Sequence, residues 1–93
     1  MRISGNIDHP ILKISVFKNE GRTSVKFETS LYEQTFKLGD DERFSTVEGV
    51  QKIVDASMIE QVLQGFRLMH SARLESVARS FPVKTADVFE EII

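Results

Sequence analysis

The first 39 residues alternate between apolar and polar positions, as half-buried β-strands do. Because strand side chains point to opposite faces in turn, this alternation predicts two strands, near residues 12–17 and 24–28, and a third after a reversal at about 29–31. The apolar positions that would share the core-facing side are Leu12, Ile14, Val16, Val25, Phe27, Tyr32, Phe36 and Leu38.

Turn signals between these segments predict an antiparallel arrangement. Asn19-Glu20-Gly21 suits a three-residue hairpin connection, since glycine tolerates the left-handed backbone such loops require. The apolar positions change parity between Phe27 and Tyr32, as a turn or a bulge would cause. Met1–Ile7 could add a fourth, short strand at the edge of the sheet, ended by Pro10.

After the strand region the apolar spacing changes to three and four residues, which is typical of helices. Ser45 and Ser57 each precede a glutamate three positions later, the pattern of a capping box at a helix N-terminus. We therefore expect a short helix over about 46–55 and a longer one over about 57–81, with one continuous helix as the alternative. Pro82 ends the long helix, because the residue before a proline avoids helical geometry.

Together these elements predict a single α+β domain spanning residues 1–93, with a β-meander over 1–39, a helical region over 45–81 and a C-terminal segment over 82–93. The antiparallel sheet has three strands, or four with the edge strand, and the long helix packs on one face of it. The helix residues expected to cover the sheet are Ile59, Leu63, Phe66, Leu74 and Val77. One sheet and one helix make a thin core, so dimerisation would help to bury the remaining apolar surface.

One polar residue interrupts the apolar stripe of the long helix. The stripe consists of Ile59, Leu63, Phe66, His70, Leu74, Val77 and Phe81. We expect this face to be buried, and a buried histidine needs a partner. Arg73 lies one turn beyond His70, so the two form a candidate polar pair.

The favoured interpretation of this pair is a neutral core histidine bonded to a carbonyl, with Arg73 reaching water. The alternatives are a contact between subunits, or an anion or catalytic site completed by a sheet carboxylate such as Glu28 or Glu33.

A ridge of small or flexible residues adjoins the stripe, and it is a candidate surface for helix packing or dimerisation. Its members are Met58, Gly65, Met69, Ala72 and Ser76. Glycine inside a helix costs about 1 kcal/mol relative to alanine, so Gly65 indicates the close approach of another element. Packing within the domain is favoured over packing against a second subunit.

The C-terminal segment carries apolar residues at i, i+1, i+4 and i+5, which are Val88, Phe89, Ile92 and Ile93. Such a pattern can lay a helical turn into a groove. We expect this candidate docking tail to pack on its own domain in preference to a partner.

The residues and motifs that the chain lacks exclude several kinds of catalytic and metal site. Without cysteine it has no thiolate metal site, disulfide or cysteine nucleophile. It contains none of the glycine-rich phosphate or nucleophile-elbow motifs, and Asp40-Asp41-Glu42 lacks the spacing of a calcium loop. His9 and His70 are far apart in the sequence. We therefore expect no catalytic residues, no metal and no cofactor.

The formal charge of −2 is spread along the chain, and no segment resembles a signal peptide or a membrane span. A non-enzymatic cytoplasmic protein that binds itself, as a homodimer, or another protein is the favoured function. Nucleic-acid binding through Lys13, Lys26 and Lys37 on a sheet face is the first alternative, although Glu28 and Glu33 oppose it. A small-anion or ligand site around His70 and Arg73 is the third. We expect no membrane association.

Overall fold

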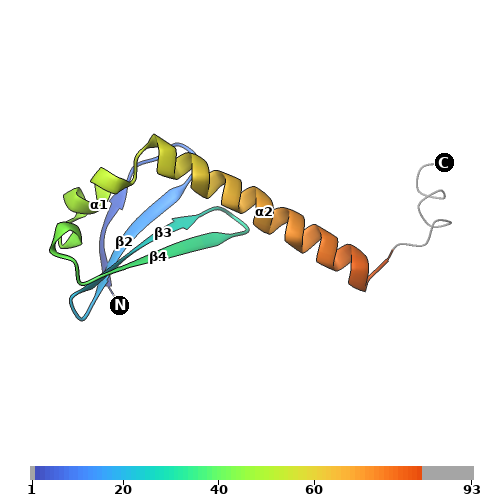
Figure 1. Ribbon diagram of the computed structural model, residues 1–93, viewed down its shortest axis with the longest axis horizontal. Coiled ribbons are helices and arrows are strands. Elements are labelled where there is room, and N and C mark those ends of the chain that lie inside the picture. Colours follow the sequence, from blue (N-terminus) through green and yellow to red (C-terminus); the bar gives the residue numbers. More distant parts are fainter. Residues whose placement is uncertain (1, 83–93) are drawn as a thin grey trace.

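The computed structural model describes residues 2–82, and residues 1 and 83–93 lie outside the described part. The chain forms an antiparallel β-meander followed by helices, so the predicted α+β class is confirmed, with the edge strand present (Figure 1). The strands, in sheet order, are β1 (Arg2–Ile7), β2 (Lys13–Asn19), β3 (Arg22–Glu28) and β4 (Glu33–Gly39). They lead to a 3₁₀ turn, η1 (Glu42–Phe44), and to the helices α1 (Val47–Ile53) and α2 (Ala56–Ser80).

The hairpin between β2 and β3 is tighter than predicted. Asn19 pairs with Arg22, so the loop has two residues in place of the expected three. Glu20 and Gly21 both adopt positive φ, at 52° and 78°, which is the signature of a type I′ turn. This turn matches the right-handed twist of the strands that it joins.

One face of the sheet forms the core. Ile14 pairs with Phe27, and Val16 with Val25, and all four side chains are buried. Phe36 of β4 is opposite Val25, and its ring meets that of Phe27 edge to face at 5.7 Å. Phe36 is 37% exposed, since it lies on an edge strand of the sheet. Phe36 therefore packs at the edge of the core, although it was predicted to lie under the long helix.

Residues 46–81 form two helices, as predicted, and the alternative of one continuous helix is wrong; α1 joins α2 in covering this face, where only the long helix was expected. Both predicted N-caps are wrong in position. Thr46 caps α1 by accepting a hydrogen bond from the Gly49 amide at 3.2 Å, while the Ser45 hydroxyl donates to the Glu42 carbonyl. Asp55, with extended backbone, caps α2 by accepting from the Met58 amide at 2.8 Å. Its carboxylate accepts a hydrogen bond from an amide that has no partner within the helix, and its negative charge interacts favourably with the positive end of the helix dipole.

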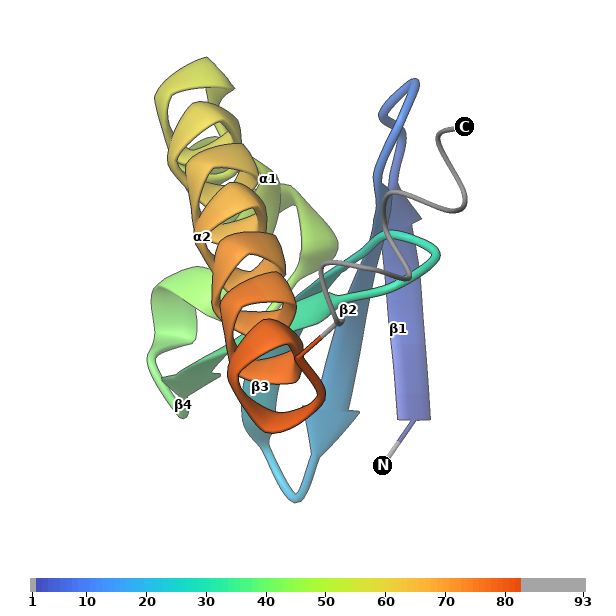
Figure 2. The same cartoon turned by 90° about the vertical axis from the view of Figure 1, so that its right-hand side faces the viewer.

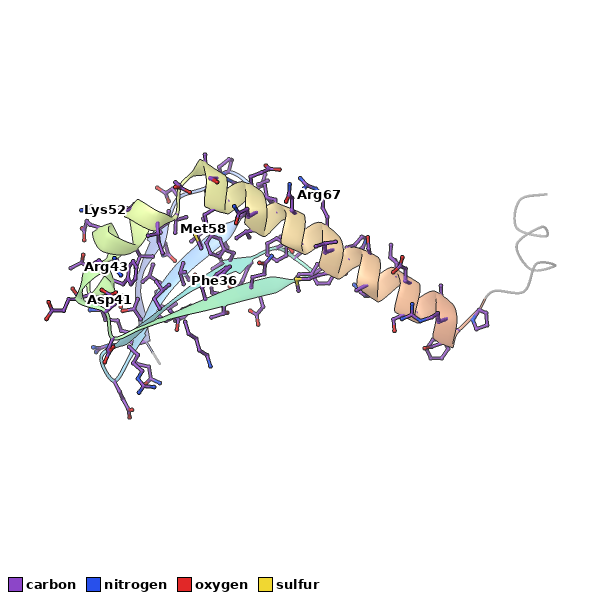
Figure 3. All side chains as sticks on the ribbon, viewed as in Figure 1. Phe36, Asp41, Arg43, Lys52, Met58 and Arg67 are labelled. Carbon is purple, nitrogen blue, oxygen red and sulfur yellow. The ribbon has the colours of Figure 1, made fainter. Side chains whose placement is uncertain are left out.

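Only the first half of α2 packs on the sheet. Val62 and Phe66 are buried there with Val50 of α1, and Met58 lies between α2 and the sheet (Figure 3). From His70 to Ser80 every residue of α2 is exposed, and Figures 1 and 2 show the helix passing over one side of the sheet and continuing beyond the β3–β4 turn. A helix of 25 residues is about 37 Å long, whereas a seven-residue strand spans only about 24 Å. The predicted burial of Leu74 and Val77 is therefore wrong.

Candidate functional site

The second half of α2 presents an apolar face without a neighbour among residues 2–82. We call this surface the distal face and define it as His70, Leu74, Val77 and Phe81. Leu74, Val77 and Phe81 are 56%, 50% and 76% exposed. Leu74 and Val77 follow Leu63 and Phe66 by eleven residues, which is close to three full turns. The exposed half of α2 therefore keeps two apolar positions of the half that packs on the sheet, while Arg73 and Ser80 stand where Val62 and Met69 pack.

His70 marks the point where α2 leaves the sheet. Its Nδ1 lies 2.9 Å from the hydroxyl oxygen of Tyr32, and the two rings meet edge to face at 5.8 Å. The predicted core position of His70 is wrong, because the residue is exposed. Its partner is the Tyr32 hydroxyl and not a backbone carbonyl. The sequence gives only a weak signal for this contact, namely the single tyrosine of the chain, directly before β4.

The structure does not assemble the predicted polar pair. Arg73 is exposed, and within residues 2–82 it makes no ion pair and no hydrogen bond to His70. The carboxylates considered as partners, Glu28 and Glu33, both contact Lys26 instead. His70 and Arg73 therefore lie on the same stretch of helix without forming a common site.

The ridge of small residues is divided by the edge of the sheet. Met58 and Met69 pack against the core, whereas Ala72 and Ser76 are exposed beyond it. The neighbour of Gly65 is Gln34 of β4: a Cβ at position 65 would lie 2.8 Å from Gln34 Nε2. That same nitrogen donates to the Val62 carbonyl at 2.8 Å. No sequence pattern pointed to Gln34, which is a polar residue on the inward face of an edge strand.

The predicted docking tail lies outside the described residues. Val88, Phe89, Ile92 and Ile93 therefore have no structural assignment here.

The charges on the second half of α2 are arranged unevenly around the helix. With a step of about 100° per residue, Arg67 and Arg73 fall about 60° on either side of the distal face. Glu75 and Arg79 fall on the opposite side of the helix. Arg67 approaches Glu60 at 3.9 Å, but both side chains are well exposed, so the pair contributes little. The flanks of the distal face are thus basic, and Figure 3 shows Arg67 on the side of α2 that points away from the sheet.

The second face of the sheet is mainly polar, with Phe17 and Ile3 as apolar exceptions, and no helix of residues 2–82 covers it. The strand register places Lys13, Lys26 and Lys37 on this face, as predicted. Lys26 Nζ lies 3.2 Å from Glu28 and 3.6 Å from Glu33, and 5.1 Å from the centre of the Phe17 ring. Its hydrogen bond to Glu28 holds the pKa of Lys26 above the ordinary value, against the opposing effect of burial. The charge of Lys26 is therefore already matched within the sheet.

A cleft of about 400 Å³ opens on this face near the β2–β3 turn. Phe17, Arg22, Lys37 and Asp40 are among the residues that line it, so it carries charges of both signs. Within residues 2–82 no three histidine or carboxylate side chains gather as a metal ion would need. The cleft therefore has no feature that selects one class of ligand.

Comparison with known proteins adds no assignment to this geometry. No helix in the described part of the chain is long and apolar enough to cross a membrane. No family model, curated protein or solved structure matches this chain.

Proposed function

We propose that this protein is non-enzymatic and acts by protein–protein binding, as a homodimer whose contact surface is the distal face. The observation that carries the proposal is the continuation of α2 for about three turns beyond the sheet, with an apolar pattern at Leu74, Val77 and Phe81. A helix repeats such a pattern where the face is to be covered. A second copy of the chain is the simplest cover, since twofold contacts are the commonest among soluble oligomers.

The energy available from this face can be compared with the cost of association. Burying the exposed part of one such side chain contributes about 1–2 kcal/mol. A twofold contact covers Leu74, Val77 and Phe81 of both copies, so the total is about 6–12 kcal/mol. Association itself costs about 4–15 kcal/mol. The two ranges overlap, so the distal face alone supports at most a weak dimer, and any further contact would strengthen it.

The other two functions have less support. Binding of nucleic acid through the sheet would depend on Lys13 and Lys37, because Lys26 is paired with Glu28 and Glu33. A site for a small anion would require His70 and Arg73 to converge, and the hydrogen-bond partner of His70 within residues 2–82 is instead Tyr32. Both alternatives also leave the apolar part of the distal face without a role.

The test is a comparison of native mass by size exclusion with light scattering. A variant with both Leu74→Glu and Val77→Glu places charges in the centre of the distal face, at positions where residues 2–82 have little packing to lose. Leu68→Glu is the matched control, because Leu68 is 73% exposed on the opposite side of α2. We expect the unaltered protein and the control to be dimers and the double variant to be a monomer. A double variant that stays dimeric would refute the proposal.

A further inference from the structure

The flanks of the distal face restrict which part of a second copy can cover it; this step rests on the proposed homodimer. If two distal faces packed directly on each other, Arg67 and Arg73 of both copies would line one seam. Glu60 approaches Arg67 at 3.9 Å, but this exposed pair offsets its charge only weakly, and the carboxylate of Glu75 is on the far side of the helix. Four arginines around one apolar contact repel one another, so direct pairing of the two faces is disfavoured.

The remaining described surface offers no better cover. Outside α2 and its C-cap, the other strongly exposed large apolar residues are Ile3, Ile11 and Leu31, which lie on three separate segments. The uncovered face of the sheet carries more lysine than carboxylate side chains. Neither surface within residues 2–82 combines apolar area with negative charge.

The sequence of residues 83–93 has that combination. It contains one lysine against three carboxylates, Asp87, Glu90 and Glu91. Its apolar residues, Val88, Phe89, Ile92 and Ile93, would share one side of a helix, with the carboxylates on the rest of the circumference. This is the complement of an apolar face with basic flanks.

We propose that residues 83–93 of one copy dock on the distal face of the other, so that the dimer forms by reciprocal exchange of its C-terminal segments. If residues 85–93 adopted a helix, it would span about 13 Å, which is close to the distance of about 10 Å from Leu74 to Phe81. The exchange adds four apolar side chains per copy to a contact that the distal face alone makes only weakly.

Charge reversal tests the exchange. The first variant carries Arg67→Glu and Arg73→Glu; the second carries Asp87→Lys, Glu90→Lys and Glu91→Lys. Each should weaken dimerisation at low salt by at least about tenfold, because acid meets acid or base meets base. When the two variants are mixed, each tail meets a face of opposite charge, and a 1:1 heterodimer should form. Arg79→Glu, on the opposite side of α2, is the control and should leave the dimer unchanged.

The outcomes separate this inference from the proposed function. Recovery of the dimer on mixing also shows that neither variant has lost its fold. If the tail variant dimerises as tightly as the unaltered chain while the Leu74→Glu, Val77→Glu variant is monomeric, the exchange is wrong and the homodimer stands. If the unaltered protein is a monomer, with its tail held on its own helix, both are wrong.

Discussion

Gly65→Ala removes the one glycine of α2, and the structure predicts that its effect depends on Gln34. A Cβ at position 65 would lie 2.8 Å from Gln34 Nε2 and 3.2 Å from Gln34 Oε1. The nearer distance is shorter than side chains tolerate, so the Gln34 amide must move away. That movement breaks its 2.8 Å hydrogen bond to the Val62 carbonyl.

Two opposing effects set the change in the free energy of unfolding caused by Gly65→Ala. Alanine in place of glycine within a helix stabilises by about 1 kcal/mol. Loss of the Gln34 hydrogen bond costs about 0.5–1.5 kcal/mol. In the unaltered background the two terms nearly cancel, and the free energy of unfolding should change by less than about 0.5 kcal/mol. In a Gln34→Ala background no amide has to move, so the same change should give the full gain of about 1 kcal/mol.

The assay is a double-mutant cycle by urea denaturation, followed by circular dichroism at one fixed protein concentration because a dimer's stability depends on it. The expected coupling between positions 34 and 65 is about 1 kcal/mol. An equal gain in both backgrounds would refute the contact between Gly65 and Gln34. A change in native mass caused by Gly65→Ala would instead assign Gly65 to an interface between subunits.

Two further predictions concern the core and the acidic connector. Phe66→Ala should lower the free energy of unfolding by about 3–5 kcal/mol in the same assay, because Phe66 is only 7% exposed; a loss below about 1 kcal/mol would contradict the core. Arg43 lowers the pKa of Asp41 below its ordinary 3.8, chiefly by its side-chain hydrogen bond. Because the pKa of Asp41 is lowered in the folded state, its carboxylate stabilises the fold above about pH 4, and this stabilisation is lost as the pH falls further. Arg43→Ala should therefore raise the Asp41 pKa towards 3.8 in an NMR titration. An unchanged pKa would refute the pairing.

The strands were predictable because alternation encodes both the strand and its buried face. Ile14, Val16, Val25 and Phe27 are buried as the pattern predicts, and Gly21 adopts the left-handed conformation. The helix boundaries were predictable to within two residues. Their caps were not, since Thr46 and Asp55 competed with Ser45 and Ser57 for the same role, and only backbone geometry decides between neighbours.

The candidate site was harder to predict, because it depends on how far the sheet reaches under α2. Periodicity shows that Phe66 and Val77 share a helix face, but it does not show where the sheet ends. The interpretation of His70 failed for this reason. Gln34 and Tyr32 also escaped prediction, since their contacts with α2 depend on the crossing of α2 over β4, which neither segment encodes alone.

The central claim is that the distal face is covered by a second copy of this chain. Its most direct test is the native mass of the 93-residue chain, measured by light scattering over a range of micromolar concentrations. The account predicts a species of twice the 10.6 kDa chain mass, dissociating on dilution. A constant 10.6 kDa at the highest concentration would contradict it.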